Sequence, residues 1–226
     1  MVAKTPIPIL ANVHTSLALI WAIRLTWFLL HREYINWPEW HAKVGEVDKR
    51  ATLQSKATIW LTCSAFYAMM MYPCVIRMKD AISNGQSAKI WGKVGKAGLA
   101  LQFSGLFVET LADYQKGDFK RKPGNRNKFC DVGLWKVSSY PNYLGEVVFW
   151  CGTFLGGLSC NQSPVDWLIS TCGLLFILTV IKGALDSLQT KHVKKYCNSK
   201  EYLSWRDKRG FFGPIPKCLQ NQGLPM

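Results

Sequence analysis

The chain has 226 residues, of which 49% are hydrophobic and 13% aromatic, and 28 Lys and Arg against 14 Asp and Glu give it a formal net charge of +14. This apolar fraction excludes a disordered chain, because disordered segments are poor in apolar residues. The apolar residues come in blocks of 16 to 20 instead of recurring at the short period of a soluble core. The composition therefore predicts an all-α protein that crosses a membrane several times.

Five apolar blocks are candidates for membrane-spanning helices. About 20 helical residues cross a hydrocarbon core of ~30 Å, so the first two blocks are long enough alone and the other three need interfacial flanks. In chain order, the expected spans are residues 11–30, 57–76, 97–112, 143–158 and 165–181. We expect them to form one membrane domain over residues 1–226, a helical bundle that ends in a basic tail over residues 182–226.

The Lys and Arg residues outside the spans are shared unevenly between the two faces of this bundle, 21 against 6. The richer face holds the segment after the first span, the segment between the third and fourth spans, and the C-terminal tail. Because cytoplasmic loops are enriched in Lys and Arg, we expect the C-terminus on the cytosolic or matrix side. The same asymmetry accounts for the net charge through contact with anionic membrane lipids, and the sequence has no nucleic-acid-binding motif, so no nucleic-acid partner is expected.

The charged residues inside the expected spans include Arg24, Glu109 and Glu146. A charge at membrane depth costs at least ~2.5 kcal/mol, so each needs a partner or a wet cavity. One interpretation is a structural ion pair between Arg24 and one of the carboxylates. The other is a polar site between helices, in which Glu109 contacts a substrate.

The polar residues of the third and fourth spans continue into a basic segment. Glu109 and Asp113 are spaced i,i+4, as are Asn142 and Glu146, so each pair shares one helical face. Such a site would suit a ligand with anionic phosphates and a polar ring, although the cations could instead meet only lipid headgroups. The cations of the segment are Lys116, Lys120, Arg121, Lys122, Arg126 and Lys128.

The eight cysteines include no CxxC pair, and four of them lie inside the expected spans. This spacing is typical of neither a disulfide framework nor a zinc site. We therefore expect no metal.

From residue 109 onward, an ordered series of motifs resembles the steroid 5-alpha-reductase C-terminal domain family, including its small DUF1295-like membrane members. The motifs are Glu109-x3-Asp113-x-Gln115-Lys116-x2-Phe119, then Gly133-Leu-Trp135, then Pro141-Asn-Tyr-x-Gly-Glu146. The likeness covers roughly residues 109–216, and residues 20–25, with Arg32 eight residues after Arg24, look like an earlier span of the family.

This resemblance implies an NADPH-dependent reduction of a carbon–carbon double bond in a steroid or other lipid, with the cofactor site opening to the cytosolic face. In the family, the positions of Asp113, Asn142 and Glu146 line the cofactor site, and His192-x3-Tyr196 matches a His/Tyr pair there. The expected cofactor-binding residues are Asp113, Lys116, Asn142, Tyr143, Glu146, His192 and Tyr196.

Two departures from the family pattern bear on chemistry. An Arg that helps hold the cofactor falls near Leu188 here, beside Gln189, and Trp21 stands where a catalytic Tyr would be. An indole cannot serve as a proton donor near neutral pH, so the sequence identifies no catalytic residue. Four tyrosines could replace the missing one: Tyr67, Tyr72, Tyr140 and Tyr143.

Two other functions stay open on the sequence. The departures would permit a non-catalytic family member that serves as a membrane subunit of a larger complex. An isoprenylcysteine-type methyltransferase has a similar bundle, but residues 187–192 supply no cofactor-binding Arg. The N-terminus resembles neither a signal peptide nor a transit peptide, which favours the endoplasmic reticulum over the mitochondrial inner membrane.

Overall fold

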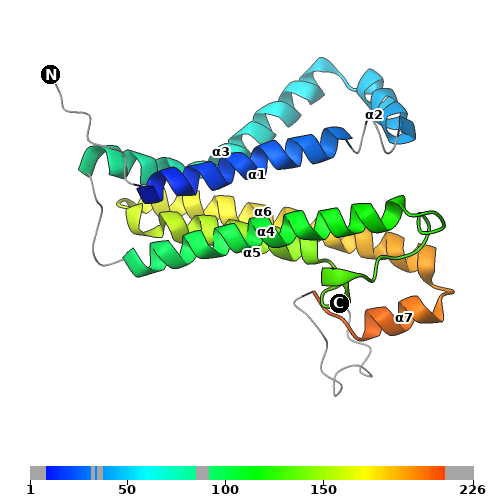
Figure 1. The fold of residues 1–226 in the computed structure, drawn as a ribbon. Coiled ribbons are helices and arrows are strands. Elements are labelled where there is room, and N and C mark those ends of the chain that lie inside the picture. The colour runs from blue at the N-terminus through cyan, green and yellow to red at the C-terminus, as the bar shows by residue number, and fades with distance from the viewer. Residues whose placement is uncertain (1–8, 32–33, 35–37, 85–91, 212–226) are drawn as a thin grey trace. The chain divides into compact units, whose positions relative to one another are not determined.

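A computed structural model describes residues 9–31, 34, 38–84 and 92–211 of the chain. Over these residues the regular structure is helical, and no β-strand occurs among them (Figure 1). The elements are α1 (Ile9–His31), α2 (Pro38–Arg50), α3 (Leu53–Asn84), α4 (Gly92–Arg121), η2 (Gly133–Lys136), α5 (Pro141–Gly157), η3 (Leu158–Cys160), α6 (Pro164–Tyr196) and α7 (Lys200–Asp207).

The predicted all-α membrane architecture is confirmed. By length and composition, four of the described helical segments could cross a membrane, and they contain the first, second, fourth and fifth expected spans. The third expected span, residues 97–112, lies in α4, a helix of 30 residues that is not one of these four. Charged residues at its ends, which include Lys93, Lys96 and Lys120, lower the mean hydropathy of this helix.

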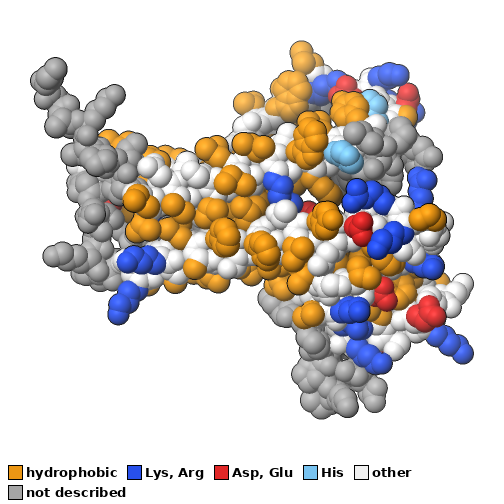
Figure 2. Space-filling view, in the orientation of Figure 1, with side chains coloured by type: hydrophobic (Ala, Val, Ile, Leu, Met, Phe, Trp, Pro, Cys, Tyr) orange, Lys and Arg blue, Asp and Glu red, His pale blue; other side chains and the backbone are white. Residues whose placement is uncertain are grey.

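Large apolar side chains are exposed along the membrane helices, and they cover much of the face shown in Figure 2. Trp27 of α1 is 71% exposed and Leu61 of α3 is 73% exposed. Since a lipid chain solvates such side chains as well as a protein core does, their exposure agrees with helices that face lipid.

Contacts group the chain into two compact units. Unit 1 comprises Met1–Leu99 and Thr153–Phe176, and unit 2 comprises Ala100–Gly152 and Ile177–Met226. The residues of each unit are far apart in sequence, so each fold depends on long-range packing.

Proline sets the start of α5 and of α6. Pro141 and Pro164 are the first residues of these helices, where the missing N–H is not needed and the fixed φ is already helical. Ser163 adds a capping box at α6, because its Oγ accepts from the backbone N–H of Asp166 at 3.1 Å while Asp166 Oδ2 accepts from the N–H of Ser163 at 2.9 Å.

In unit 2, α4 and α5 approach so closely that only glycine fits at their crossing. A Cβ on Gly105 would lie 2.3 Å from the backbone nitrogen of Phe149, and one on Gly145 would lie 2.5 Å from that of Glu109. These small residues let the two backbones touch.

In unit 1, buried polar side chains of α1 and α3 bond to the C-terminal part of α5 and to the loop that follows it. Arg77 Nη1 donates to the carbonyl of Gly156, and His14 Nε2 lies 3.1 Å from the carbonyl of Thr153. Asp80 accepts from Gln162 Nε2 at 3.2 Å. Arg77 and Asp80 are one turn apart on α3, so one face of this helix holds both the end of α5 and the loop that follows it.

Candidate functional site

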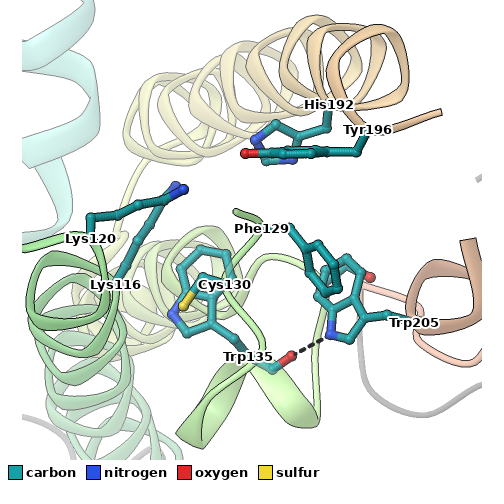
Figure 3. Close-up of a pocket in the computed structure, with 9 residues that line it drawn as sticks. Lys116, Lys120, Phe129, Cys130, Trp135, His192, Tyr196 and Trp205 are labelled. Atoms are coloured by element: carbon teal, nitrogen blue, oxygen red, sulfur yellow. Dashed lines mark hydrogen bonds between the residues drawn. The ribbon is translucent and has the colours of Figure 1, made fainter. Parts of the chain in front are cut away.

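Unit 2 contains a pocket with an empty volume of about 310 Å³, part of which is open to solvent (Figure 3). Its wall is formed by α4, by the segment between α4 and α5, by α6 and by α7. The lining residues are Lys116, Lys120, Phe129, Cys130, Trp135, Ser139, His192, Tyr196 and Trp205.

Two helices each contribute a pair of side chains one turn apart. Lys116 and Lys120 extend from α4, and His192 and Tyr196 extend from α6 (Figure 3). Residues at i and i+4 lie on one face of a helix, so both members of each pair reach the same space. The pocket therefore combines two ammonium groups with an imidazole and a phenol.

A tight turn between α4 and α5 positions Trp135 in the wall. Gly133 adopts a φ of +54°, and any Cβ there would lie 2.4 Å from the side chain of Gln115. Gln115 Oε1 accepts from the backbone N–H of Leu134 at 2.8 Å, and Trp135 Nε1 donates to the carbonyl of Ala112 at 3.0 Å. These bonds fix the indole against α4, where Lys116 Nζ lies 4.8 Å from its ring centroid.

The segment over residues 205–211 forms the last part of the wall. Trp205 Nε1 donates to the carbonyl of Trp135 at 3.0 Å, and Ser139 Oγ donates to that of Arg209 at 2.7 Å. Ser138 Oγ donates to the carbonyl of Phe211 at 2.6 Å. We call this segment the C-terminal strap, and it holds Trp205 in the pocket through bonds to the turn before α5.

The pocket is electropositive. Lys120 Nζ donates to the carbonyls of Arg126, at 3.2 Å, and of Lys128. Burial, and then the charges of Lys195 and Lys116, lower the pKa of Lys120 to about 8. Carbonyl partners leave the positive charge without a counter-charge, so an anion bound here would be stabilised by it.

Tyr140, in the turn directly before α5, contacts the pocket residue His192. Its hydroxyl lies 3.4 Å from His192 Nδ1, and the two rings stack with centroids 5.8 Å apart. With Cys130 and Trp135 it forms a buried cluster against which Tyr143 packs. Burial raises the pKa of the Tyr140 hydroxyl, so this group stays protonated at neutral pH.

The predicted site residues occupy three kinds of place. Lys116, His192 and Tyr196 line the pocket. Tyr143 lies beside it in the Cys130 cluster. The remaining four, Glu109, Asp113, Asn142 and Glu146, lie on α4 and α5 outside the pocket wall.

Among these four, Glu109 and Asn142 have informative surroundings. Glu109 is 3% exposed, at the close crossing where a Cβ on Gly145 would meet its backbone. The buried Oδ1 of Asn142 has no hydrogen-bond partner among the residues that the structure describes, and a buried oxygen of this kind is costly unless a ligand or water donates to it. Arg24 belongs to unit 1 and the two carboxylates to unit 2, so their ion pair stays a prediction.

Sequence reasoning missed most of the aromatic wall. Trp205 has no motif around it, and Trp135, although it belongs to the Gly133-Leu-Trp135 motif, was not among the predicted site residues. Their place depends on the hydrogen bonds of the strap and the turn, which no local pattern encodes. Leu188, where the family carries its Arg, packs against the Cys130 cluster, so this position contributes packing in place of a charge.

The residues present suit a phosphate-bearing cofactor. Lysines of α4 offer positive charge, and the indoles and phenols offer flat surfaces for a ring. No group of three His, Cys, Asp or Glu that could hold a metal occurs in the described part of the chain.

Comparison with known proteins assigns the family. The family described as "Protein of unknown function (DUF1295)" matches residues 4–209. The chain belongs to this family. DUF1295 is related to steroid 5-alpha-reductase-like proteins, which accords with the motif series from Glu109 to Glu146.

A curated relative of this DUF1295 chain is the "Uncharacterized protein C594.04c" of Schizosaccharomyces pombe (strain 972), which is 27% identical over 131 residues. The match covers 50% of the present chain and 37% of that relative, so the chain spans little more than a third of the relative's length. No solved structure gives a significant match.

Proposed function

We propose that this DUF1295 protein is an NADPH-dependent reductase that acts on a carbon–carbon double bond in a steroid or other lipid. The observation that carries the proposal is the pocket of unit 2, where Lys116, His192 and Tyr196 meet although they are up to 80 residues apart in the sequence. The relation of the family to steroid 5-alpha-reductase-like proteins supports the same chemistry.

Each residue contacts the part of NADPH that matches its own chemistry. Lys116 and Lys120 bind its phosphates, because ammonium groups are strong donors to phosphate oxygens. Tyr196 and Trp135 provide flat apolar surfaces. Asn142 lies outside the pocket wall, and its Oδ1, which lacks a donor in the described structure, is assigned to an N–H of the part of the ligand that extends beyond the pocket. When bound, the cofactor supplies a hydride to the double bond.

The substrate is a lipid that enters from the membrane. The exposed apolar faces of the spanning helices keep the protein in the bilayer, where a steroid or other lipid is concentrated. Glu109, buried at the crossing of α4 and α5, is the polar group that we assign to the substrate. We place the protein in the endoplasmic reticulum, with the pocket on the cytosolic face.

NADPH binding to the full-length protein in detergent tests this proposal. We expect saturable enhancement of NADPH fluorescence, with affinity lowered about tenfold by Asn142→Ala, the loss of one buried hydrogen bond. Asn198→Ala, at an exposed position of the same unit, should leave the affinity unchanged.

Three outcomes separate the alternatives. Binding of S-adenosylmethionine in place of NADPH would favour the methyltransferase. Binding of neither ligand by a folded protein would overturn the reductase and favour a non-catalytic subunit. An equal loss in both Asn variants would show that the change is not specific to Asn142.

A further inference from the structure

A buried tyrosine contacts the only imidazole that lines the described pocket. The Tyr140 hydroxyl and His192 Nδ1 are 3.4 Å apart, and Tyr140 is 8% exposed. Tyr140 comes from the turn before α5 and His192 from α6, so 52 residues of chain separate them. Of the two residues, His192 is the one that lines the pocket.

The direction of this hydrogen bond follows from what each group can accept. A phenol has one hydrogen to donate, and a buried O–H that lacks an acceptor is unfavourable. Within the described structure, His192 Nδ1 is the one partner of the Tyr140 hydroxyl. If the imidazole donated instead, the phenolic hydrogen would have no acceptor, so Tyr140 donates and Nδ1 accepts.

The surroundings of His192 also favour its neutral form. The charged groups that act on it are Lys116 and Lys120 of α4 and Lys195 of α6, all of them cations. The other titratable groups against it are the phenols of Tyr140 and Tyr196 and, across the pocket, the thiol of Cys130, which are neutral at pH 7. Burial disfavours a charge on the imidazole, and a fourth positive charge beside three ammonium groups is repelled, so the imidazole stays uncharged.

A neutral imidazole whose Nδ1 accepts must carry its hydrogen on Nε2. We propose that Tyr140 is a positioning residue that fixes His192 as the neutral Nε2–H tautomer, so that His192 donates to a carbonyl or carboxamide oxygen in the pocket. The proposal deepens the reductase function and rests on it for the identity of the ligand. The tautomer itself depends only on the protein.

This arrangement gives the pocket two separate recognition elements. The lysines of α4 attract an anionic group, whereas His192 offers a single uncharged donor. A neutral donor suits an uncharged oxygen, because it gains a hydrogen bond without the desolvation of a charge. The ligand that satisfies both carries a phosphate and an amide or ketone oxygen.

Nitrogen-15 NMR of the full-length, histidine-labelled protein in detergent, without any cofactor, tests the tautomer. His192→Gln identifies the His192 signals among those of the four histidines. We expect a protonated Nε2 and an unprotonated Nδ1 whose resonance is displaced by an accepted hydrogen bond. In Tyr140→Phe, the Nδ1 resonance should move to the position of a nitrogen without a donor.

Tyr202→Phe is the matched control, because Tyr202 is buried in the same unit and contacts Tyr196 but has no contact with His192. Its His192 spectrum should equal that of the wild type. A protonated Nδ1 in the wild type would overturn the proposal even if Tyr140→Phe failed to fold. An unchanged Nδ1 resonance in a folded Tyr140→Phe protein would also overturn it.

NADPH affinity provides the second measurement. We expect Tyr140→Phe to weaken binding about fivefold and Tyr202→Phe to leave it unchanged, since only the first loses the fixed donor. An affinity that is equal in wild type and Tyr140→Phe would overturn the role in binding. If the wild type shows the expected tautomer but binds no NADPH, the reductase function fails and the Tyr140–His192 pairing stands.

Discussion

Buried polar groups in the two units have different partners. In unit 1, Arg77 donates to the carbonyl of Gly156 and Asp80 accepts from Gln162, so these charged groups hold the end of α5 and the loop that follows it. In unit 2, Lys116 and His192 face a cavity. Polar side chains thus form a structural clamp in unit 1 and line a cavity in unit 2.

Arg77→Met should break the clamp and give the largest effect. Its removal leaves the Gly156 carbonyl without its donor in a buried place, and we expect a loss of about 3 kcal/mol in the free energy of unfolding. Thermal unfolding in detergent measures it. Lys79→Met, two residues away and exposed, should change the stability little.

The NADPH affinity of the surviving folded Arg77→Met protein sharpens the contrast. Since the pocket lies wholly in unit 2, we expect this affinity to stay within a factor of about two of the wild-type value. A large loss of affinity at unchanged stability would show that Arg77 serves binding and would remove the distinction between the units.

Lys120→Met tests the assignment of the unit 2 pocket to ligand binding, and it should lower the affinity for NADPH. Loss of a charge-assisted contact with a phosphate is worth about 2 kcal/mol, or roughly 30-fold in affinity. Lys122→Met is the control, because Lys122 is exposed and pairs with Asp118 at 3.3 Å. Equal affinities for the two variants, measured by NADPH fluorescence titration, would contradict the pocket assignment.

The pH dependence of NADPH binding should follow the protonation of Lys120. Its pKa is lowered to about 8 in the folded protein, and phosphate binding needs the protonated form. Affinity should therefore fall as pH rises from 7 to 9, by up to about tenfold for one titrating group, and Lys120→Met should flatten this profile.

Stability without ligand responds to Lys120 in the opposite direction. The unfolded lysine titrates near its ordinary value of 10.5, so between pH 8 and that value the unfolded chain binds more protons than the folded one. The contribution of Lys120 to stability therefore rises with pH across this window.

A wild-type affinity for NADPH that is independent of pH would show that Lys120 does not contact the phosphate.

Gly117→Ala should give the smallest effect and a favourable one. Gly117 lies in α4 with no atom near its Cβ position, so alanine adds helix propensity without a clash, about 0.5 kcal/mol of stability. Gly105→Ala on the same helix would meet Phe149 and should destabilise. Paired thermal melts of the two variants measure this difference.

Much of the fold could be predicted from the sequence, because apolar blocks of membrane length are a local signal. Prolines at residues 141 and 164 mark the starts of α5 and α6 as well. The short helices α2 and α7 were not predicted, since each is polar and too brief to show a membrane pattern. The grouping into two units depends on contacts between distant segments, which no local pattern records.

The site was predictable where a helix carried it. Lys116, His192 and Tyr196 were chosen from motifs on what became α4 and α6, and they line the pocket. Tyr140 was one of four possible tyrosines, and only the 3.4 Å approach to His192 distinguishes it. Trp205 could not be selected, because its contact with Trp135 joins residues 70 positions apart.

The C-terminal strap has a consequence for biogenesis. A chain emerging from the ribosome has made all its spanning helices by Tyr196, yet the pocket lacks Trp205 and the strap bonds to Ser138 and Ser139 until residue 211 follows. Because chains fold progressively during synthesis, insertion into the bilayer precedes completion of the pocket. The newborn protein is thus anchored in the membrane before the wall of its pocket is complete.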